Sequence, residues 1–153
     1  MAKLKKGDKA PGFNLTDQNG KKVKLSDFKG KILLLYFYPK ANTGGCTKQA
    51  IGIRDAKGDL DRLGVIPVGI SPDPPDTQKK FEAKHDLGFS LLSDLDHKVA
   101  DAYGAWGEKS MYGKKYEGII RSSFLISQDA RIMEAWYKVS PQDTVPKALN
   151  AMP

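Results

Sequence analysis

The sequence predicts an α/β fold in which strands and helices alternate along the chain. The stretch from Ile32 to Tyr38 is a continuous apolar, β-branched and aromatic run, which is typical of a buried strand. The segment after it carries apolar residues at three- and four-residue spacing, the pattern of an amphipathic helix: Ala50, Ile53, Ala56, Leu60 and Leu63. Further alternation of this kind implies a mostly parallel sheet, to which a closing hairpin adds antiparallel pairing.

Length and composition favour one domain over residues 1–153. A chain of 153 residues with 40% apolar content can bury one substantial core. Neither an internal repeat nor a linker nor a shift in composition divides the sequence. We therefore expect a single domain.

The N-terminal third predicts a hairpin before the central strand. Phe13 to Thr16 and Lys22 to Leu25 are short alternating runs that flank an Asn19-Gly20 pair, the strongest local hairpin signal. The central strand Ile32 to Tyr38 follows after Gly30. We expect the helix after the central strand to end at Gly64.

The rest of the chain continues the alternation. The predicted elements are a strand Val65 to Ile70, a helix capped by Asp76 or Thr77 and running to about His85, a strand Phe89 to Leu92, a short helix His97 to Tyr103, an irregular segment Gly104 to Gly118, strands Ile119 to Ile126 and Ile132 to Tyr137, and a helix from Pro141 through Leu149. This order of elements is the thioredoxin-like arrangement, with a central mixed sheet flanked by helices.

Charge and cysteine content restrict the function classes. The net charge of +7 arises largely from scattered lysines that are not interleaved with aromatic residues, so a solvated basic surface is favoured over a nucleic-acid interface. The single cysteine cannot form an intrachain disulfide and fits a reducing compartment. Met1 to Pro11 lacks the apolar core of a secretory signal, and the longest apolar run is too short to span a membrane. We expect a cytoplasmic protein.

That single cysteine, Cys46, lies where the central strand gives way to a helix. Pro39 cannot donate to a strand ladder, and the Asn-Thr-Gly-Gly stretch after it supplies N-cap chemistry and a permissive backbone. A helix therefore begins within a residue or two of Cys46. The unpaired N–H groups and the macrodipole at a helix N-terminus favour the thiolate, the reactive form of cysteine. The alternative interpretation is a small buried apolar side chain without chemistry.

Arg121 is the second residue that needs an explanation. It lies in the otherwise apolar run Ile119 to Ile126, and burying an unpaired charge costs several kcal/mol. One interpretation is an edge arginine that points into solvent. The other places the guanidinium across the sheet edge from Cys46, where it would stabilise the thiolate and the charge that develops on an attacked oxygen.

These residues match a known family pattern. The spacing Pro39-x-x-x-Thr43-x-x-Cys46 resembles the signature of peroxiredoxins, and the chain is similar to their bacterioferritin comigratory protein or peroxiredoxin Q subgroup. The similarity extends over nearly the whole chain, at Gly7-Asp8, Ala10-Pro11, Phe37-Tyr38-Pro39-Lys40, Gly45-Cys46-Thr47-Lys48, Ser71-Pro72-Asp73, Leu92-Ser93-Asp94, Tyr103-Gly104, Trp106-Gly107 and Arg121-Ser122.

The resemblance implies a thiol-dependent peroxidase that reduces hydrogen peroxide and organic hydroperoxides to water and alcohols. It assigns Cys46 as the nucleophile, Thr43 as the hydroxyl that orients the peroxide, Arg121 as the activating cation and Pro39 as a shield of the pocket. The oxidised product is a cysteine sulfenic acid, and neither a metal nor an organic cofactor is required. A monomer or weak dimer is expected.

The chain departs from the subgroup at two positions. Gly44 stands where proline is usual, which should loosen the first helical turn. Ile51 stands where many members carry a resolving cysteine, and Phe81 to Leu87, the other usual place, contains none. A one-cysteine mechanism follows, recycled by thioredoxin, glutaredoxin or a small thiol. A non-catalytic redox sensor and a basic binding module are the alternative functions.

Overall fold

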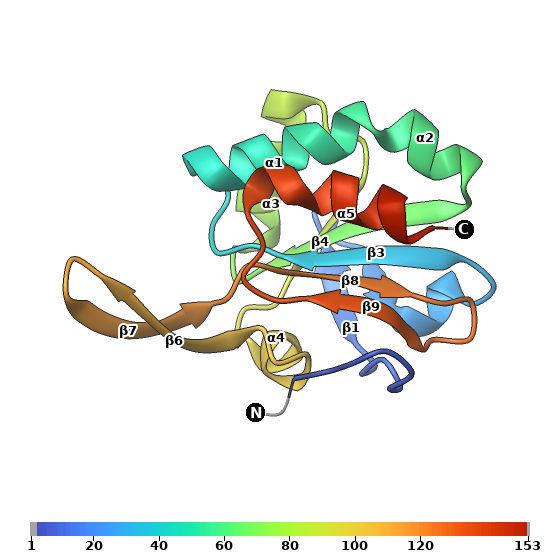
Figure 1. Ribbon diagram of the computed structural model, residues 1–153. Helices are drawn as coiled ribbons and strands as arrows, with labels where there is room; N and C mark the ends of the chain where they lie inside the picture. The colour runs from blue at the N-terminus through green and yellow to red at the C-terminus, as the bar shows by residue number, and fades with distance from the viewer. Residues whose placement is uncertain (1–2, 153) are drawn as a thin grey trace.

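The computed structural model describes residues 3–152 and is built on a central seven-stranded sheet (Figure 1). From one edge to the other the strands are β2 (Lys22–Lys24), β1 (Asn14–Asp17), β5 (Ser90–Ser93), β4 (Val65–Ser71), β3 (Ile32–Phe37), β8 (Ser122–Ile126) and β9 (Ile132–Trp136). The predicted N-terminal hairpin is confirmed as β1 and β2, and it joins the sheet by pairing Thr16 with Ser93.

The sheet is mixed, and less of it is parallel than the alternation of elements predicted. The β3–β4 and β4–β5 pairings are parallel, whereas the pairings of β1 with β2 and β5, and of β8 with β3 and β9, are antiparallel. The two parallel pairings are those joined by helical crossovers, which return the chain to the same end of the sheet. The hairpins at both ends of the sequence add the antiparallel strands.

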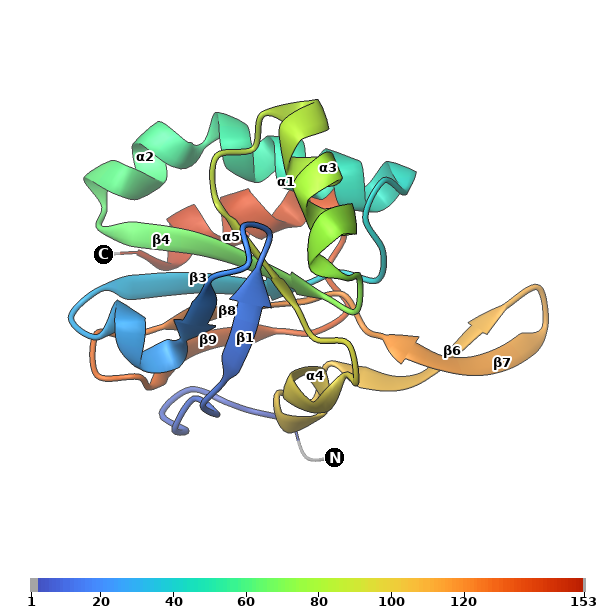
Figure 2. The same ribbon diagram turned by 180° about the vertical axis from the view of Figure 1, so that it is seen from behind.

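Helices cover the two faces of the sheet unequally. Four helices, α1 (Gly44–Asp55), α2 (Lys57–Arg62), α3 (Pro75–His85) and α5 (Thr144–Ala151), lie over one face, and the short α4 (Lys98–Ala102) lies on the other with the N-terminal segment (Figures 1 and 2). Strand β3 separates two cores, because Leu34 and Tyr36 pack under the four helices while Leu33, Leu35 and Phe37 pack on the opposite side. Within the described residues, no helix is long and apolar enough to cross a membrane.

The segment predicted to be irregular, Gly104 to Gly118, instead contains a two-stranded arm. Strands β6 (Trp106–Met111) and β7 (Lys114–Ile119) pair with each other and project from the body of the molecule (Figure 1). The turn between them places Tyr112 and Gly113 at positive φ, as tight hairpin turns require. Because most of β7 faces solvent, its sequence lacks the period-two apolar pattern by which a half-buried strand is recognised.

Other predicted boundaries need smaller corrections. The run Ile119 to Ile126 is not one strand, because β7 ends at Ile119 and β8 begins at Ser122. The helix expected to reach Gly64 is interrupted at Ala56, and α3 is capped by Pro74 rather than Asp76 or Thr77. The segment Leu25–Phe28 forms the 3-10 helix η1, and Pro141–Asp143 forms the 3-10 helix η2 before α5 begins.

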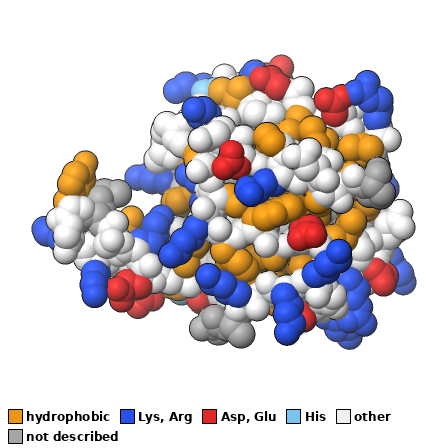
Figure 3. Space-filling model, viewed as in Figure 1, with side chains coloured by type: hydrophobic (Ala, Val, Ile, Leu, Met, Phe, Trp, Pro, Cys, Tyr) orange, Lys and Arg blue, Asp and Glu red, His pale blue; other side chains and the backbone are white. Residues whose placement is uncertain are grey.

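Basic side chains are distributed over the surface. In Figure 3 lysines and arginines occur over the whole visible face, with several in its lower part and fewer acidic side chains between them. Such a distribution is typical of a solvated surface.

Candidate active site

Cys46 is the third residue of α1, which begins directly after the loop that follows β3. Asn42 at positive φ and Thr43 in an extended conformation turn the chain into the helix at Gly44. The prediction that a helix begins within a residue or two of Cys46 is confirmed. The cysteine is a free thiol and only 1% exposed, so its sulfur lies in a dehydrated environment in the first turn of the helix.

Arg121 lies beside this sulfur. Its Nη2 donates a hydrogen bond to Cys46 Sγ at 3.3 Å. Strand β8 pairs antiparallel with β3, and the register sets Ser122 opposite Phe37, so the residue before β8 reaches the end of β3 from which the cysteine loop departs. The interpretation that placed Arg121 across the sheet edge from Cys46 is therefore confirmed in geometry. It sits in the interruption between β7 and β8 rather than inside a strand.

A glycine permits this close approach. A Cβ atom built on Gly45 would lie 3.2 Å from Nη2 of Arg121 and 3.4 Å from Cγ of Pro141. Any larger residue at position 45 would push against the guanidinium. The sequence showed a glycine pair before the cysteine, but only the structure distinguishes the function of Gly45 from that of Gly44.

Gln49 is a site residue that sequence reasoning missed. It lies three residues after Cys46 and so on the same face of α1, and it is fully buried. Its Oε1 accepts a hydrogen bond from Arg121 Nη1 at 2.6 Å, and its Nε2 donates to the buried Thr144 Oγ1 at 2.8 Å. One guanidinium nitrogen is thus held by Gln49 while the other contacts the sulfur. A glutamine on the apolar face of a predicted helix was the available signal.

Replacing Gln49 by methionine is expected to slow peroxide reduction about tenfold, because Arg121 would lose its anchor and the buried Thr144 hydroxyl its partner. The same loss should reduce the free energy of unfolding by about 1–3 kcal/mol. Stopped-flow kinetics and urea denaturation measure the two effects. Thr144→Val is the matched control: it removes the outer hydrogen bond alone and should reduce stability while leaving most of the rate. Equal rates in wild type and Gln49→Met would contradict a positioning function for Gln49.

Thr43 and Pro39 form the loop in front of the cysteine. Thr43 is exposed, and its hydroxyl donates to the Lys40 carbonyl oxygen at 3.0 Å rather than capping the helix. Its own carbonyl accepts the first helical hydrogen bond, from the Thr47 N–H at 2.9 Å. Pro39 is half-buried and is the second residue after β3. Their functions stay predictions.

Two ionisable side chains near the site, Lys109 and Tyr36, have shifted pKa values. Burial, followed by the positive charge of Arg121, lowers the pKa of Lys109 on β6, whereas Cys46 acts in the opposite direction. Burial raises the pKa of Tyr36 well above its usual value, so this phenol beneath the site stays neutral at physiological pH. Lys109 was missed because its segment was predicted to be irregular.

Gly44 occupies the first position of α1, where proline is favourable. The N–H of a first helical residue has no intrahelical partner, the residue before it is extended, and no atom lies within 4 Å of a Cβ built at position 44. Gly44→Pro is therefore expected to raise the free energy of unfolding by about 0.4–1 kcal/mol, chiefly by restricting the unfolded chain. Urea denaturation tests this value. Gly45→Ala provides the contrast, since it should disturb Arg121 and lower the peroxidase rate; a destabilising Gly44→Pro would contradict the argument.

No cluster of three or more His, Cys, Asp or Glu side chains arranged to hold a metal ion occurs in the part of the chain that the structure describes. The chemistry at hand is that of a thiol, a guanidinium and a hydroxyl.

The site combines a single cysteine at a helix N-terminus of a thioredoxin-like fold with an arginine that donates a hydrogen bond to its sulfur. This combination is typical of thiol-based redox enzymes. The family model described as "AhpC/TSA family" matches residues 6–135, and the chain belongs to this family.

Relatives and solved structures agree with this assignment. The chain is 51% identical over 143 residues to the putative peroxiredoxin bcp of Haemophilus influenzae, covering 94% of this chain and 92% of the relative. It is 53% identical over 132 residues to peroxiredoxin Bcp of Escherichia coli K12, covering 86% and 85% of the two chains. A solved cysteine-to-serine mutant of PrxQ from Xylella fastidiosa superimposes with a TM-score of 0.91 at 30% identity, covering 98% of this chain and 96% of the other.

Proposed function

We propose that this peroxiredoxin reduces hydroperoxides through Cys46 alone and is recycled by an external thiol. The observation that carries the proposal is the 3.3 Å contact between the Arg121 guanidinium and the sulfur of the only cysteine. The cation and the helix N-terminus favour the thiolate, and burial strengthens the attraction between the sulfur and the guanidinium because it excludes water from between them. A basic binding module requires neither arrangement, whereas a redox sensor would share the activated thiolate and differ in lacking turnover by a thiol.

The proposed reaction has two halves. In the first, the thiolate attacks the terminal peroxide oxygen: the S–O bond forms, the O–O bond breaks, and the leaving oxygen takes the electron pair and a proton as water or an alcohol. In the second, a thiol attacks the sulfenic acid to release water and form a mixed disulfide, which another thiol reduces. Arg121 stabilises the thiolate and the negative charge that develops on the attacked peroxide.

Thr43 and Pro39 complete the proposed site. Because the Thr43 hydroxyl donates its proton to the Lys40 carbonyl oxygen, it offers lone pairs to the O–H of an incoming hydroperoxide. Pro39 shields the thiolate from bulk water. These assignments rest on the position of both residues in the loop before α1.

We infer a peroxide substrate that includes organic hydroperoxides and a reductant such as thioredoxin, glutaredoxin or a small thiol. A structure of the Xanthomonas campestris bacterioferritin comigratory protein, 33% identical to this chain, concerns alkyl peroxide reduction. The free cysteine supports a cytoplasmic location, where thiols stay reduced. A single unit over residues 1–153, acting as a monomer or weak dimer, suffices for this chemistry.

The test is to mix reduced protein with one equivalent of hydrogen peroxide and to trap the sulfenic acid with dimedone. In wild type, hydrogen peroxide should oxidise Cys46 in a fast second-order reaction, and dimedone should then label this residue. Cys46→Ser should give no label. A rate no greater than that of free cysteine would overturn the proposal and favour the inert binding module. Fast oxidation without turnover by any thiol would favour the redox sensor.

The function of the Thr43 hydroxyl is tested by substitution. Thr43→Val keeps the shape of the side chain but removes its lone pairs, so the rate of peroxide reduction should fall about tenfold or more with little change in stability. Thr43→Ser retains the hydroxyl and should stay active. Stopped-flow oxidation of the three proteins measures the effect, and equal rates for the valine and serine variants would exclude the hydroxyl from the reaction.

A further inference from the structure

A cavity lies at the opposite end of β3 from Cys46. It has a volume of about 390 Å³, within the usual range for small-molecule pockets. The antiparallel pair Leu33 and Ile126 lies at its floor, where β3 begins and β8 ends. The site described above lies at the other end of these strands, so the cavity belongs to a separate part of the molecule.

The inner wall of this cavity is apolar because the core on the α4 side of the sheet lies directly behind it. Phe13, Leu33 and Ile126 belong to the core on the α4 side of the sheet, and Leu25 and Phe28 of η1 pack against its edge. On this face only a short 3-10 helix covers the end of the core, whereas four α-helices cover the other face. The apolar area available to a ligand is that of the partly buried Leu25 and Phe28, and an apolar ligand group that covers it removes this area from water.

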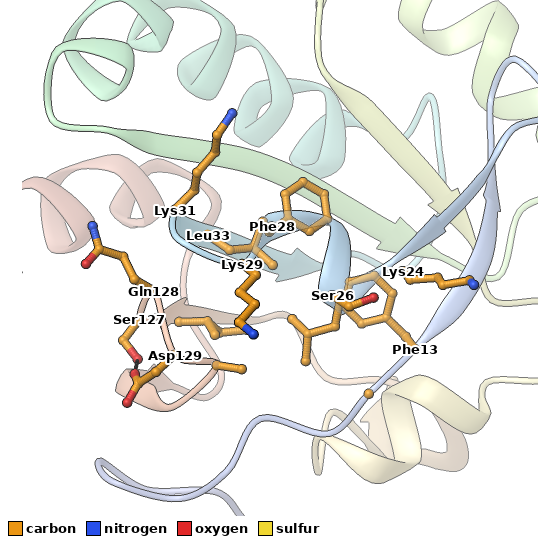
Figure 4. A pocket seen from close by; sticks show the side chains of 14 residues that line it. Phe13, Lys24, Ser26, Phe28, Lys29, Lys31, Leu33, Ser127, Gln128 and Asp129 are labelled. Atoms are coloured by element: carbon orange, nitrogen blue, oxygen red, sulfur yellow. Dashed lines mark hydrogen bonds between the residues drawn. The ribbon is translucent and has the colours of Figure 1, made fainter.

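The mouth of the cavity carries three lysines. Lys24, Lys29 and Lys31 line it, and none of them forms an ion pair among the residues that the structure describes. In Figure 4 the Lys29 side chain points into the space between Ser26 and the turn at Ser127 to Asp129, while Lys24 and Lys31 point away from this space in different directions. The mouth is therefore positively charged, with one ammonium group placed over the apolar floor.

The acidic groups near the mouth are already engaged in local hydrogen bonds. The Asp129 carboxylate accepts a hydrogen bond from the Ser127 hydroxyl within its own turn (Figure 4). The Asp27 carboxylate accepts the Lys24 backbone N–H at 2.9 Å. Neither carboxylate forms an ion pair with a lysine of the mouth, and because a hydrogen bond leaves the carboxylate charge in place, the three lysines exceed the two carboxylates by one positive charge.

The two sides of the cavity are held in place by backbone hydrogen bonds. The Gly30 N–H donates to the Gln128 carbonyl oxygen at 3.0 Å and joins the loop before β3 to the turn after β8. That turn is closed by the Ser127 N–H donating to the Arg131 carbonyl oxygen at 2.7 Å. These hydrogen bonds fix the two sides of the opening relative to each other, so binding would require little further ordering of the backbone.

We propose that this cavity binds an amphipathic carboxylate, with its alkyl chain on the apolar floor and its head group at Lys29. The apolar interior offers no donors that would bind a compact polar anion deeply, and the cationic mouth gives an anionic head an advantage over a neutral one. A fatty acid of medium chain length has this chemistry. Lys24 and Lys31 add attraction at longer range.

The test is a titration of the full chain with decanoate below its micelle-forming concentration, followed by ¹H–¹⁵N NMR. Shifts should concentrate at the cavity and leave the Cys46 region unchanged. Lys29→Glu should weaken decanoate binding about tenfold, since reversal replaces an attraction by a repulsion at a partly exposed site. Lys80→Glu on α3 makes the same change in net charge away from the cavity and should bind like wild type. The peroxidase rate should be unchanged in both variants.

Two further measurements separate the contribution of the head-group charge from that of the apolar cavity. Decanol should bind wild type and Lys29→Glu equally, because it lacks the charge, and Ser26→Trp should block both ligands by filling the mouth. Equal binding of decyl sulfate and decanoate would widen the ligand class to any anionic head. The proposal is overturned if decanoate shifts only residues outside the cavity, or if wild type, Lys29→Glu and Ser26→Trp bind it equally.

Discussion

Replacing Arg121 by alanine is expected to slow the reaction of Cys46 with hydrogen peroxide by about two to three orders of magnitude, the usual cost of removing one preorganised donor to developing charge. The loss has two components. The thiolate loses the N–H that reaches its sulfur at 3.3 Å, and the attacked peroxide loses a cation at the position where negative charge develops. Stopped-flow measurement of the second-order rate constant under excess peroxide gives the effect directly.

Arg121→Lys serves as the control for charge alone. Lysine retains a positive charge but has no planar fork, so it cannot contact both Gln49 and the sulfur as the guanidinium does. We expect partial recovery of the rate. Because Arg121 is only half-buried, the alanine variant should stay folded, which circular dichroism can verify. A wild-type rate in Arg121→Ala would remove this residue from the site.

Introducing a second cysteine at position 51 is expected to convert the one-cysteine mechanism into one with an internal disulfide. In Ile51→Cys the new thiol can attack the Cys46 sulfenic acid, releasing water and forming the S–S bond. The two Cα atoms lie five helical residues apart, roughly 8 Å or more. A disulfide tolerates at most about 7 Å. The first turns of α1 must therefore unwind before the bond can form.

The variant should form the internal disulfide after one equivalent of peroxide, lose helical signal when oxidised, and turn over faster with thioredoxin than wild type. Non-reducing mass spectrometry, circular dichroism and a coupled assay measure these three results. Wild type should instead remain a sulfenic acid or an intermolecular or mixed disulfide. Adding Gly44→Pro to Ile51→Cys should slow disulfide formation, since proline stabilises the turn that must open. The prediction fails if the bridge never forms, or if wild type already turns over with thioredoxin equally fast.

The local structure around Cys46 could be predicted because short-range chemistry determines it. A buried apolar run ending at Pro39 fixes the end of a strand, and the Asn-Thr-Gly-Gly stretch supplies the conformations from which a helix starts. Both signals lie within a dozen residues of the cysteine. The absence of a second cysteine is equally a property of the sequence, and it determines that resolution needs an outside thiol.

The arm β6–β7 shows where prediction from the hydrophobic pattern fails, because this segment was predicted to be irregular. Its strands form through pairing with each other, and their exposed faces carry glycines and charges, so no apolar period marks them. The same failure extended the predicted strand Ile119 to Ile126 backward over Arg121. Because β7 ends at Ile119 and β8 begins at Ser122, Arg121 lies outside both strands, and its side chain can reach the sulfur.

The sequence by itself placed the single cysteine at a helix start and predicted that Arg121 would face either an anion or an opening to water. Only the tertiary structure decided how Arg121 is held, because its hydrogen bonds to Gln49 and Cys46 join residues 72 and 75 positions apart, and the Gln49 bond to Thr144 spans 95. Such contacts depend on the register of β8 against β3 and on where α5 packs over α1. Register and packing are set by the burial of two whole cores at once, so no local stretch of sequence encodes them.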